Sequence, residues 1–177
     1  WTGPFIMAMI NTKIVRRTNT LINLKYGKKF SYQEVMTFSS GTFTRVRAEL
    51  FRLGLGIFAM ALRIKLLCFF LKTFILPSPG SGPPRSEREN GFFNITLVGK
   101  ARKENGSFFK IKGSIYGDKD PGYAGTARML GESAICLALN KNDLPKIYGI
   151  LTPASAIGRI LINKLIIKGM KFQVEKL

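Results

Sequence analysis

The feature that most constrains the fold is a long apolar stretch, residues 44–76, whose hydrophobic residues recur with the period of a helix. At 100° per residue, Arg45, Glu49, Arg52 and Arg63 fall on one side of this helix. Most of its leucine, isoleucine and phenylalanine side chains lie elsewhere around the axis. The stretch is therefore predicted to be a helix with one basic side and a broad apolar remainder.

The charges in this stretch bear on whether it crosses a membrane. A membrane span needs about 20 mainly apolar residues. Here the uncharged run is only Leu53 to Leu62, and Arg63 and Lys65 would lie near the middle of the bilayer. We therefore expect a basic amphipathic helix that lies on a membrane surface, or a helix that packs against a partner protein.

The charge balance favours an anionic partner. Lysine and arginine number 28 against 10 acidic residues, so the formal net charge is +18. Such a field attracts nucleic acid, acidic lipid or a phosphorylated ligand. Nucleic acid is the less favoured partner, because most aromatic residues fall on apolar faces rather than among basic ones. The candidates for contact with lipid headgroups or phosphate, which are otherwise solvated side chains, are Arg16, Arg17, Arg45, Arg52 and Arg63.

The chain has no histidine, which argues against several kinds of catalytic site. The usual general base, the Ser-His and Cys-His nucleophile pairs and most zinc sites all need that side chain. Cys68 and Cys136 match no metal or redox spacing, so a reducing compartment is expected. We predict no metal site.

The first third of the chain is expected to hold a helix and a strand before the long helix. Residues 4–24 suit a helix with Pro4 in its first turn, and residues 30–38 suit a strand. The segment 76–84, rich in proline and glycine, is a linker or a binding loop by composition.

The remaining residues are expected to alternate between strands and helices. Two strands, 92–98 and 107–116, flank the hairpin signal Asn105-Gly106. A helix at 123–139, a short strand at 149–153, a helix at 154–168 ended by Gly169, and a last strand at 170–174 follow. These elements predict an α+β fold.

The most distinctive polar cluster is the turn between the second strand and the next helix. Asp118, Asp120, Gly122 and Tyr123 precede a helix N-terminus, where backbone amides favour anions. The two carboxylates could be helix caps, substrate contacts or acid–base groups, and turn chemistry alone also explains Asp, Pro and Gly here. The loose dinucleotide fingerprint Gly54–Ala59 follows no predicted strand, so it lacks the context that such a site needs.

Several ordered blocks resemble one family. The first half carries Trp1–Asn11, Val15–Leu21, Tyr26-Gly27 and Phe30–Glu34. The second half carries, in order, Pro79–Pro83, Arg88–Phe92, Gly117–Tyr123, Thr126–Leu130, Glu132–Ala134 and Leu151–Ala154. Together they are similar to saccharopine-dehydrogenase-like oxidoreductases, including the bacterial trans-acting enoyl reductases. One departure is Pro84, where a serine is expected, and it weakens a phosphate-binding role for that loop.

The resemblance implies a two-domain dehydrogenase of which this chain is the C-terminal part. An N-terminal Rossmann domain would bind NAD(P), and its site would be absent here. An α+β domain with a mixed sheet and covering helices would face the substrate. Residues 1–76 would be the middle segment of that domain, and residues 77–142 would continue it with the hairpin 92–116. Residues 143–177 would pack back on the Rossmann domain, or on a partner chain that supplies it.

The function that the resemblance implies is an NAD(P)-dependent oxidoreductase acting on a lipid-type enoyl or acyl substrate. The turn Asp118–Tyr123 would border the substrate cleft, and no catalytic residue can be assigned. The fragment alone is expected to be inactive. Its expected place is the cytoplasm, peripherally on a membrane or lipid droplet. The alternatives are a non-enzymatic protein of membrane or lipid surfaces, and an inactive gene fragment.

Overall fold

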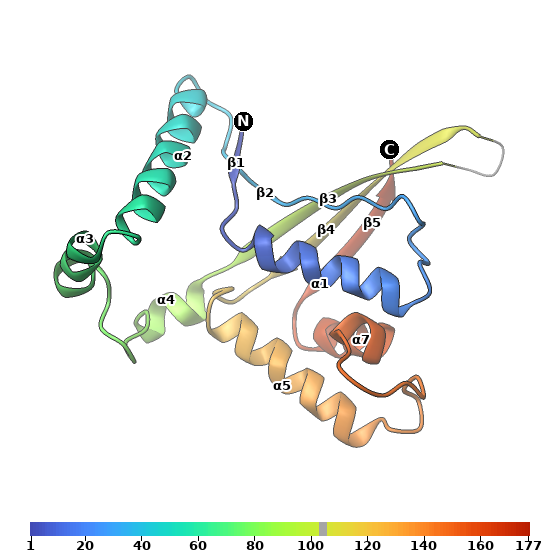
Figure 1. The fold of residues 1–177 in the computed structure, drawn as a ribbon. Helices are drawn as coiled ribbons and strands as arrows, with labels where there is room; N and C mark the ends of the chain where they lie inside the picture. Colours follow the sequence, from blue (N-terminus) through green and yellow to red (C-terminus); the bar gives the residue numbers. More distant parts are fainter. Residues whose placement is uncertain (103–105) are drawn as a thin grey trace. The chain divides into compact units, whose positions relative to one another are not determined.

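The chain forms two compact units, Trp1–Gly82 and Pro83–Leu177, in a computed structural model that describes residues 1–102 and 106–177. The boundary falls in the segment rich in proline and glycine (Figure 1). Proline and glycine are typical of loops, so this segment suits a connection between the two units.

The first unit opens with a small antiparallel ribbon and a helix. Strands β1 (Thr2–Pro4) and β2 (Val35–Thr37) pair with Thr2 opposite Thr37. Helix α1 spans Ala8–Leu21, so the expected helix exists but begins later. The placement of Pro4 in its first turn was wrong, because Pro4 pairs with Val35 in the ribbon instead.

The long apolar stretch is not one helix. It forms α2 (Thr44–Ala61), α3 (Lys65–Phe70) and a π-helical turn η1 (Leu71–Ile75). The chain bends by 106° between α2 and the α3–η1 pair, where Ile64 takes an extended conformation. Arg63 lies in this bend, so its expected place on the helical stripe of Arg45 and Arg52 was wrong. No single described helix is long and apolar enough to cross a membrane, although the bent pair passes that test by length and composition.

The second unit is built on a three-stranded sheet. Strands β3 (Phe93–Arg102), β4 (Phe108–Gly117) and β5 (Lys171–Lys176) lie in that order, and both pairings are antiparallel. The α+β class is confirmed, whereas the expected mixed sheet was wrong because both sheets are antiparallel. The predicted hairpin is present, with Gly106 at a positive φ of 84°. Asn105, the other half of its turn signal, lies outside the described residues.

Four helices complete the second unit, namely α4 (Arg85–Asn90), α5 (Ala124–Leu139), α6 (Pro153–Ala156) and α7 (Arg159–Ile167). The helix predicted at 154–168 is divided, because Gly158 adopts φ 59° and ψ −126° between α6 and α7. The strand predicted at 149–153 was wrong, since Thr152 caps α6 in a capping box with Ser155. Gly169, at φ 98°, ends α7 as expected.

The buried apolar core is small. The buried hydrophobic residues are Ala48, Cys136, Ile157, Leu165 and Met170. Most of them come from the region where α5 packs against α7 in the second unit. Many large apolar side chains are instead exposed on both units, an amount of bare surface that in a soluble domain marks interaction sites.

Candidate functional site

The predicted cluster at Asp118–Tyr123 forms the turn between β4 and α5. The turn is tight because glycines stand where it approaches its neighbours. A Cβ on Gly125 would lie 2.9 Å from the Asp120 carbonyl oxygen, and one on Gly91 would lie 2.8 Å from Asp120 Cα. Since neither neighbour is the end of a flexible side chain, only glycine fits both positions without a backbone shift. The path of this turn is therefore fixed by packing.

Asp120 is held within the turn by three hydrogen bonds. Its Oδ2 accepts the backbone N–H of Tyr123, three residues further on, at 2.6 Å. Its carbonyl accepts the N–H of Gly125 at 2.7 Å, and its own N–H donates to the Arg88 carbonyl at 3.2 Å. Asp120 thus stabilises the turn that precedes α5.

Asp118 forms an ion pair across the first turns of α5. Arg128 Nη1 donates to Asp118 Oδ1 at 2.6 Å. This hydrogen bond and the charge of Arg128 hold the pKa of the Asp118 carboxyl below its usual range. Asp118 therefore remains ionised at neutral pH and suits electrostatic anchoring better than proton donation.

The other residues of the turn are fixed to α4 or face outward. Lys119 Nζ donates to the Glu89 carbonyl at 2.9 Å, which ties the turn to the end of α4. The Gly122 backbone lies over the Asp120 carboxylate, where an added Cβ would come within 3.5 Å of Oδ1. Tyr123 is 52% exposed. Its phenol is the polar group of this turn best placed to meet a bound molecule.

The five candidate arginines come from three places in the first unit. Arg16 and Arg17 lie on exposed positions of α1, and Arg63 lies in the bend. Arg45 and Arg52 lie on α2, where the Arg45 guanidinium sits 5.3 Å from the Trp1 ring centroid and Arg52 pairs with Glu49 at 2.7 Å. The predicted stripe therefore exists on α2, without Arg63.

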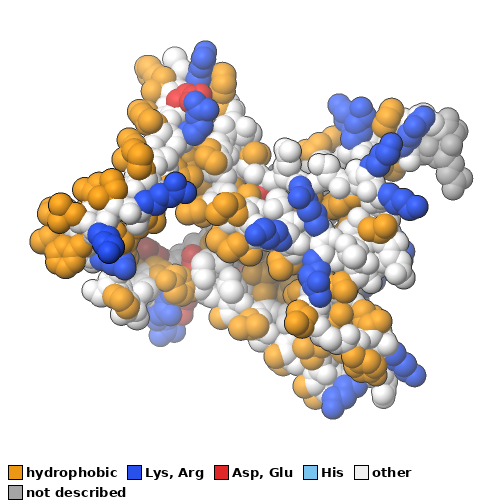
Figure 2. Space-filling model, viewed as in Figure 1, with side chains coloured by type: hydrophobic (Ala, Val, Ile, Leu, Met, Phe, Trp, Pro, Cys, Tyr) orange, Lys and Arg blue, Asp and Glu red, His pale blue; other side chains and the backbone are white. Residues whose placement is uncertain are grey.

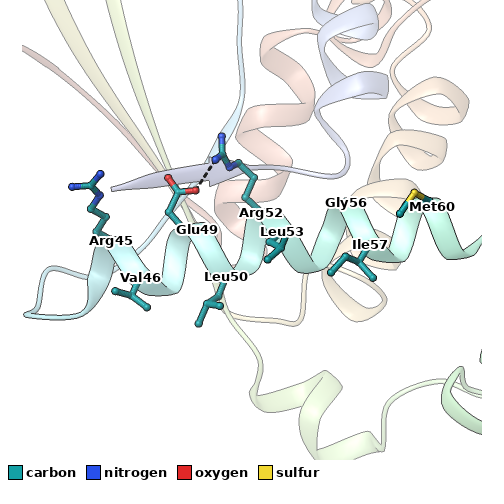
Figure 3. Close-up of a pocket in the computed structure, with 9 residues that line it drawn as sticks. All are labelled: Arg45, Val46, Glu49, Leu50, Arg52, Leu53, Gly56, Ile57 and Met60. Atoms are coloured by element: carbon teal, nitrogen blue, oxygen red, sulfur yellow. Dashed lines mark ion pairs between the residues drawn. The ribbon is translucent and has the colours of Figure 1, made fainter.

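A shallow groove of about 690 Å³ follows this part of α2. Its nine lining residues all come from that one helix (Figure 3). Glu49 and Arg52 point to one side, whereas Val46, Leu50 and Ile57 point to the other. Because one helix alone forms the groove, it resembles a docking face rather than an enclosed pocket for a small molecule.

One polar cluster was not predicted. Glu34 accepts a hydrogen bond from Asn11 Nδ2 at 2.8 Å and another from the Tyr32 hydroxyl at 2.9 Å. Burial, then the hydrogen bond and the charge of Glu34, raise the pKa of Tyr32 to about 12. The sequence signal was weak, because the cluster joins α1 to a residue 23 positions away.

A second unpredicted polar contact lies in the second unit. Glu132, a buried residue of α5, pairs with Lys168 at 3.8 Å. Lys168 is the C-cap residue of α7, so this ion pair joins the two helices that pack together there. An acidic residue within a largely apolar helix is the sequence signal that could have indicated this ion pair.

The solvent face of the sheet is more basic and aromatic than expected. Lys100 Nζ lies 4.3 Å from the Phe108 ring centroid, and Lys171 Nζ lies 5.7 Å from that of Tyr116. Lys100 and Lys110 are direct cross-strand partners. Aromatic and basic residues therefore lie side by side on this face, contrary to expectation, and nucleic acid as a disfavoured partner stays a prediction.

The described residues fit neither a metal site nor a dinucleotide site at Gly54–Ala59. Within them, no group of three or more histidine, cysteine, aspartate or glutamate side chains could hold a metal ion. The fingerprint-like Gly54–Ala59 lies inside α2, and an added Cβ at Gly54 or Gly56 would meet nothing within 4 Å. These glycines therefore form no strand-to-helix turn, and the segment does not fit a dinucleotide.

The whole chain is similar to curated reductases of the mycobacteria. These relatives are named trans-acting enoyl reductases. The relative "Putative trans-acting enoyl reductase Rv2449c" of Mycobacterium tuberculosis is 36% identical over 179 aligned positions, which cover 100% of this chain and 42% of the relative. The trans-acting enoyl reductase of Mycobacterium ulcerans is 32% identical, over 93% of this chain and 39% of the relative.

These comparisons confirm the predicted resemblance to trans-acting enoyl reductases. The chain spans about two fifths of the length of the curated relatives it matches. No protein-family profile matches the chain. No solved structure matches it either.

Proposed function

We propose that this chain is the substrate-side, C-terminal part of an NAD(P)-dependent, saccharopine-dehydrogenase-like oxidoreductase that acts on a lipid-type enoyl or acyl substrate. The observation that carries the proposal is similarity along the whole chain to proteins named trans-acting enoyl reductase. Their names specify reduction of an enoyl group, and the chain covers less than half of each.

Nucleotide binding is assigned to a separate domain or partner chain in this proposal. The Gly54–Ala59 segment does not fit a dinucleotide, because it is the middle of a helix. The residues of this chain are therefore assigned no contact with NAD(P) in this proposal. Their part is to hold and orient the substrate side of the cleft.

The turn Asp118–Tyr123 is the proposed border of that cleft. The ion pair of Asp118 with Arg128 and the hydrogen bond from the Tyr123 N–H to Asp120 hold the backbone that carries the half-exposed Tyr123. A rigid support of this kind preorganises a contact with substrate. Tyr123 either donates a hydrogen bond to the substrate or packs against its chain.

The test begins with the native protein, isolated from its source cells with an antibody raised against this chain. We expect an intact mass more than twice that of the chain, because the chain covers 42% of its relative. We also expect the isolated protein to oxidise NADPH or NADH when an enoyl thioester is added. The 177-residue chain alone should not do so. Reductant oxidation by this chain alone, or an inert native protein of matching mass, contradicts the proposal.

The alternative function is a protein of membrane or lipid surfaces without catalysis. It rests on the apolar, basic segment of the first unit rather than on the turn Asp118–Tyr123. An inert native protein of the same mass as this chain would favour that alternative or an inactive gene product.

A further inference from the structure

The bent segment, defined here as residues 44–75, exposes an apolar surface along both of its arms. On α2 the apolar side chains recur at the spacing of one helical face, namely Val46, Leu50, Leu53, Ile57 and Met60. On the second arm the exposed apolar side chains are Leu66, Leu67, Phe69, Phe70, Phe74 and Ile75. Figure 2 shows these side chains gathered over α2 and α3 with basic ones between them. Most of the apolar surface of the segment is therefore not buried within the first unit.

The same segment carries a strong positive charge. Six basic residues stand against one acidic residue, Glu49, so its formal charge is +5; the basic residues are Arg45, Arg47, Arg52, Arg63, Lys65 and Lys72. Glu49 is already paired with Arg52 at 2.7 Å. Arg63 and Lys65 lie together at the bend, between two apolar arms. A partner of this surface therefore has to offer negative charge beside an apolar layer.

The shape of the segment suits an interface better than a span. Helix α2 has 18 residues and a length of about 27 Å, and the second arm leaves it at 106°. A bilayer span requires a continuous apolar helix. Amphipathic helices that lie in the headgroup region need only an apolar face that enters the acyl boundary and cations beside it. Both arms have these two properties.

We propose that the bent segment docks on an anionic lipid membrane, with its apolar side chains in the acyl boundary and its arginines and lysines at the phosphates. Charge complementarity selects this occupant over a protein. A protein partner would need an acidic rim around an apolar surface that matches two arms at 106°. A lipid surface adapts to that shape and supplies both the negative charge of its headgroups and the apolar layer of its acyl chains. The proposal is independent of the enzymatic function proposed above, since it involves other residues and no reaction.

The first test is flotation of the 177-residue chain with vesicles of phosphatidylcholine alone or with added phosphatidylserine. We expect flotation with the anionic vesicles at low salt, a clear loss at high salt, and little with the neutral ones. Equal flotation with both kinds, unaffected by salt, would mean that a bare protein core sticks to lipid and would overturn the proposal. Absence of flotation with either kind would overturn it as well.

A pair of charge-reversal variants locates the surface. Arg63→Glu with Lys65→Glu changes the bend, whereas Lys141→Glu with Lys146→Glu makes the same charge change at exposed positions of the second unit. We expect affinity for anionic vesicles to fall by at least about 30-fold in the bend variant and by much less in the control. Circular dichroism of both variants checks that they are folded. An equal loss in the two variants would mean that the net charge alone causes binding, and the docking site would be refuted.

Insertion can be read from a single tryptophan, because Trp1 is the one tryptophan of the chain. In a Trp1→Phe background, Phe69→Trp reports from the second arm and Phe108→Trp from the exposed face of the sheet. Lipids brominated in their acyl chains should quench the emission of the Phe69→Trp variant and leave that of the Phe108→Trp variant unchanged. The reverse pattern contradicts the proposal.

Flotation of the native protein tests whether the bent segment is accessible in the protein as the cell makes it. Its flotation should match that of the 177-residue chain. A longer native protein that does not bind, although this chain does, would show that the remaining part of the protein covers the bent segment, and would overturn the proposal.

Discussion

The turn between β4 and α5 and the bent segment differ in where their side chains find partners. In the turn, Asp118, Lys119 and Asp120 all bond to neighbours within the same unit. In the bent segment, large side chains such as Leu66, at 76% exposure, and Phe74, at 68%, remain at the surface. The turn is thus determined by the chain itself, whereas the bent segment depends for its environment on something outside it.

Their glycines show the same contrast. Gly125 and Gly91 stand where an added Cβ would press on the backbone of Asp120. Gly54 and Gly56, on α2, face open space. A glycine at a close approach is required by packing, while a glycine on an exposed helix only lowers the stability of that helix. Alanine substitutions should therefore have opposite effects on stability at close-packed and at open glycines.

The largest expected effect follows from Gly125. Gly125→Ala places a Cβ 2.9 Å from the Asp120 carbonyl oxygen, and we expect it to lower the free energy of unfolding by about 1–3 kcal/mol. The control Gly131→Ala lies in the same helix with nothing within 4 Å, and should raise stability by about 0.5–1 kcal/mol. Urea unfolding followed by circular dichroism measures both. Equal changes in unfolding free energy for the two variants would contradict the distinction between close-packed and open glycines.

A smaller effect is expected at Tyr32, where the polar cluster ties α1 to the following segment. Tyr32→Phe removes the hydrogen bond to Glu34 and should cost about 1 kcal/mol of unfolding free energy at neutral pH. The folded pKa of Tyr32 is raised to about 12, above the unfolded value near 10. Its contribution is therefore complete below pH 10 and is lost as the pH rises from about 10 to about 12.

Spectroscopic titration of tyrosinate and unfolding at several alkaline pH values test this prediction. Tyr148→Phe is the control, since Tyr148 is 89% exposed and should leave stability unchanged. Loss of stability below about pH 9 through Tyr32 would contradict the direction of its shift.

The smallest effect is expected at the ion pair of the turn, which is partly exposed. Asp118→Asn should lower the unfolding free energy by about 0.5 kcal/mol at neutral pH and low salt. The folded pKa of Asp118 is depressed, so its contribution is present above the unfolded pKa near 4 and is lost as the pH falls below it. Wild type and variant should therefore converge in stability near about pH 2. A difference that persists in acid, or that is insensitive to salt, would assign the effect to packing instead.

Local patterns predicted much of the fold. The strands on either side of Gly106, the helix before Asn140 and the end of α7 at Gly169 follow from alternation, helical period and glycine conformation. The bend at residues 62–64 could not be read, because leucine, arginine and isoleucine there are all compatible with a continuing helix. The division at Gly158 was missed because a lone glycine inside a helical pattern is commonly tolerated.

The candidate site could be predicted in position but not in detail. The turn residues Asp, Pro and Gly identified the segment. Which carboxylate holds the turn and which forms an ion pair depends on Arg128, ten residues beyond Asp118 in α5. The cluster of Asn11, Tyr32 and Glu34 depends on how the chain returns to α1. Contacts of this kind come from tertiary structure, and no local pattern records them.

The order of strands in the second unit has a consequence for synthesis on the ribosome. The β3–β4 hairpin is local, but β5 joins β4 only after more than 50 further residues have been made. At about 5–20 residues per second, the β4 edge stays unpaired for several seconds. Lysine on an open edge strand disfavours pairing with another chain, and Lys110 lies on β4. We therefore expect this charge to limit aggregation of the nascent chain before its sheet is complete.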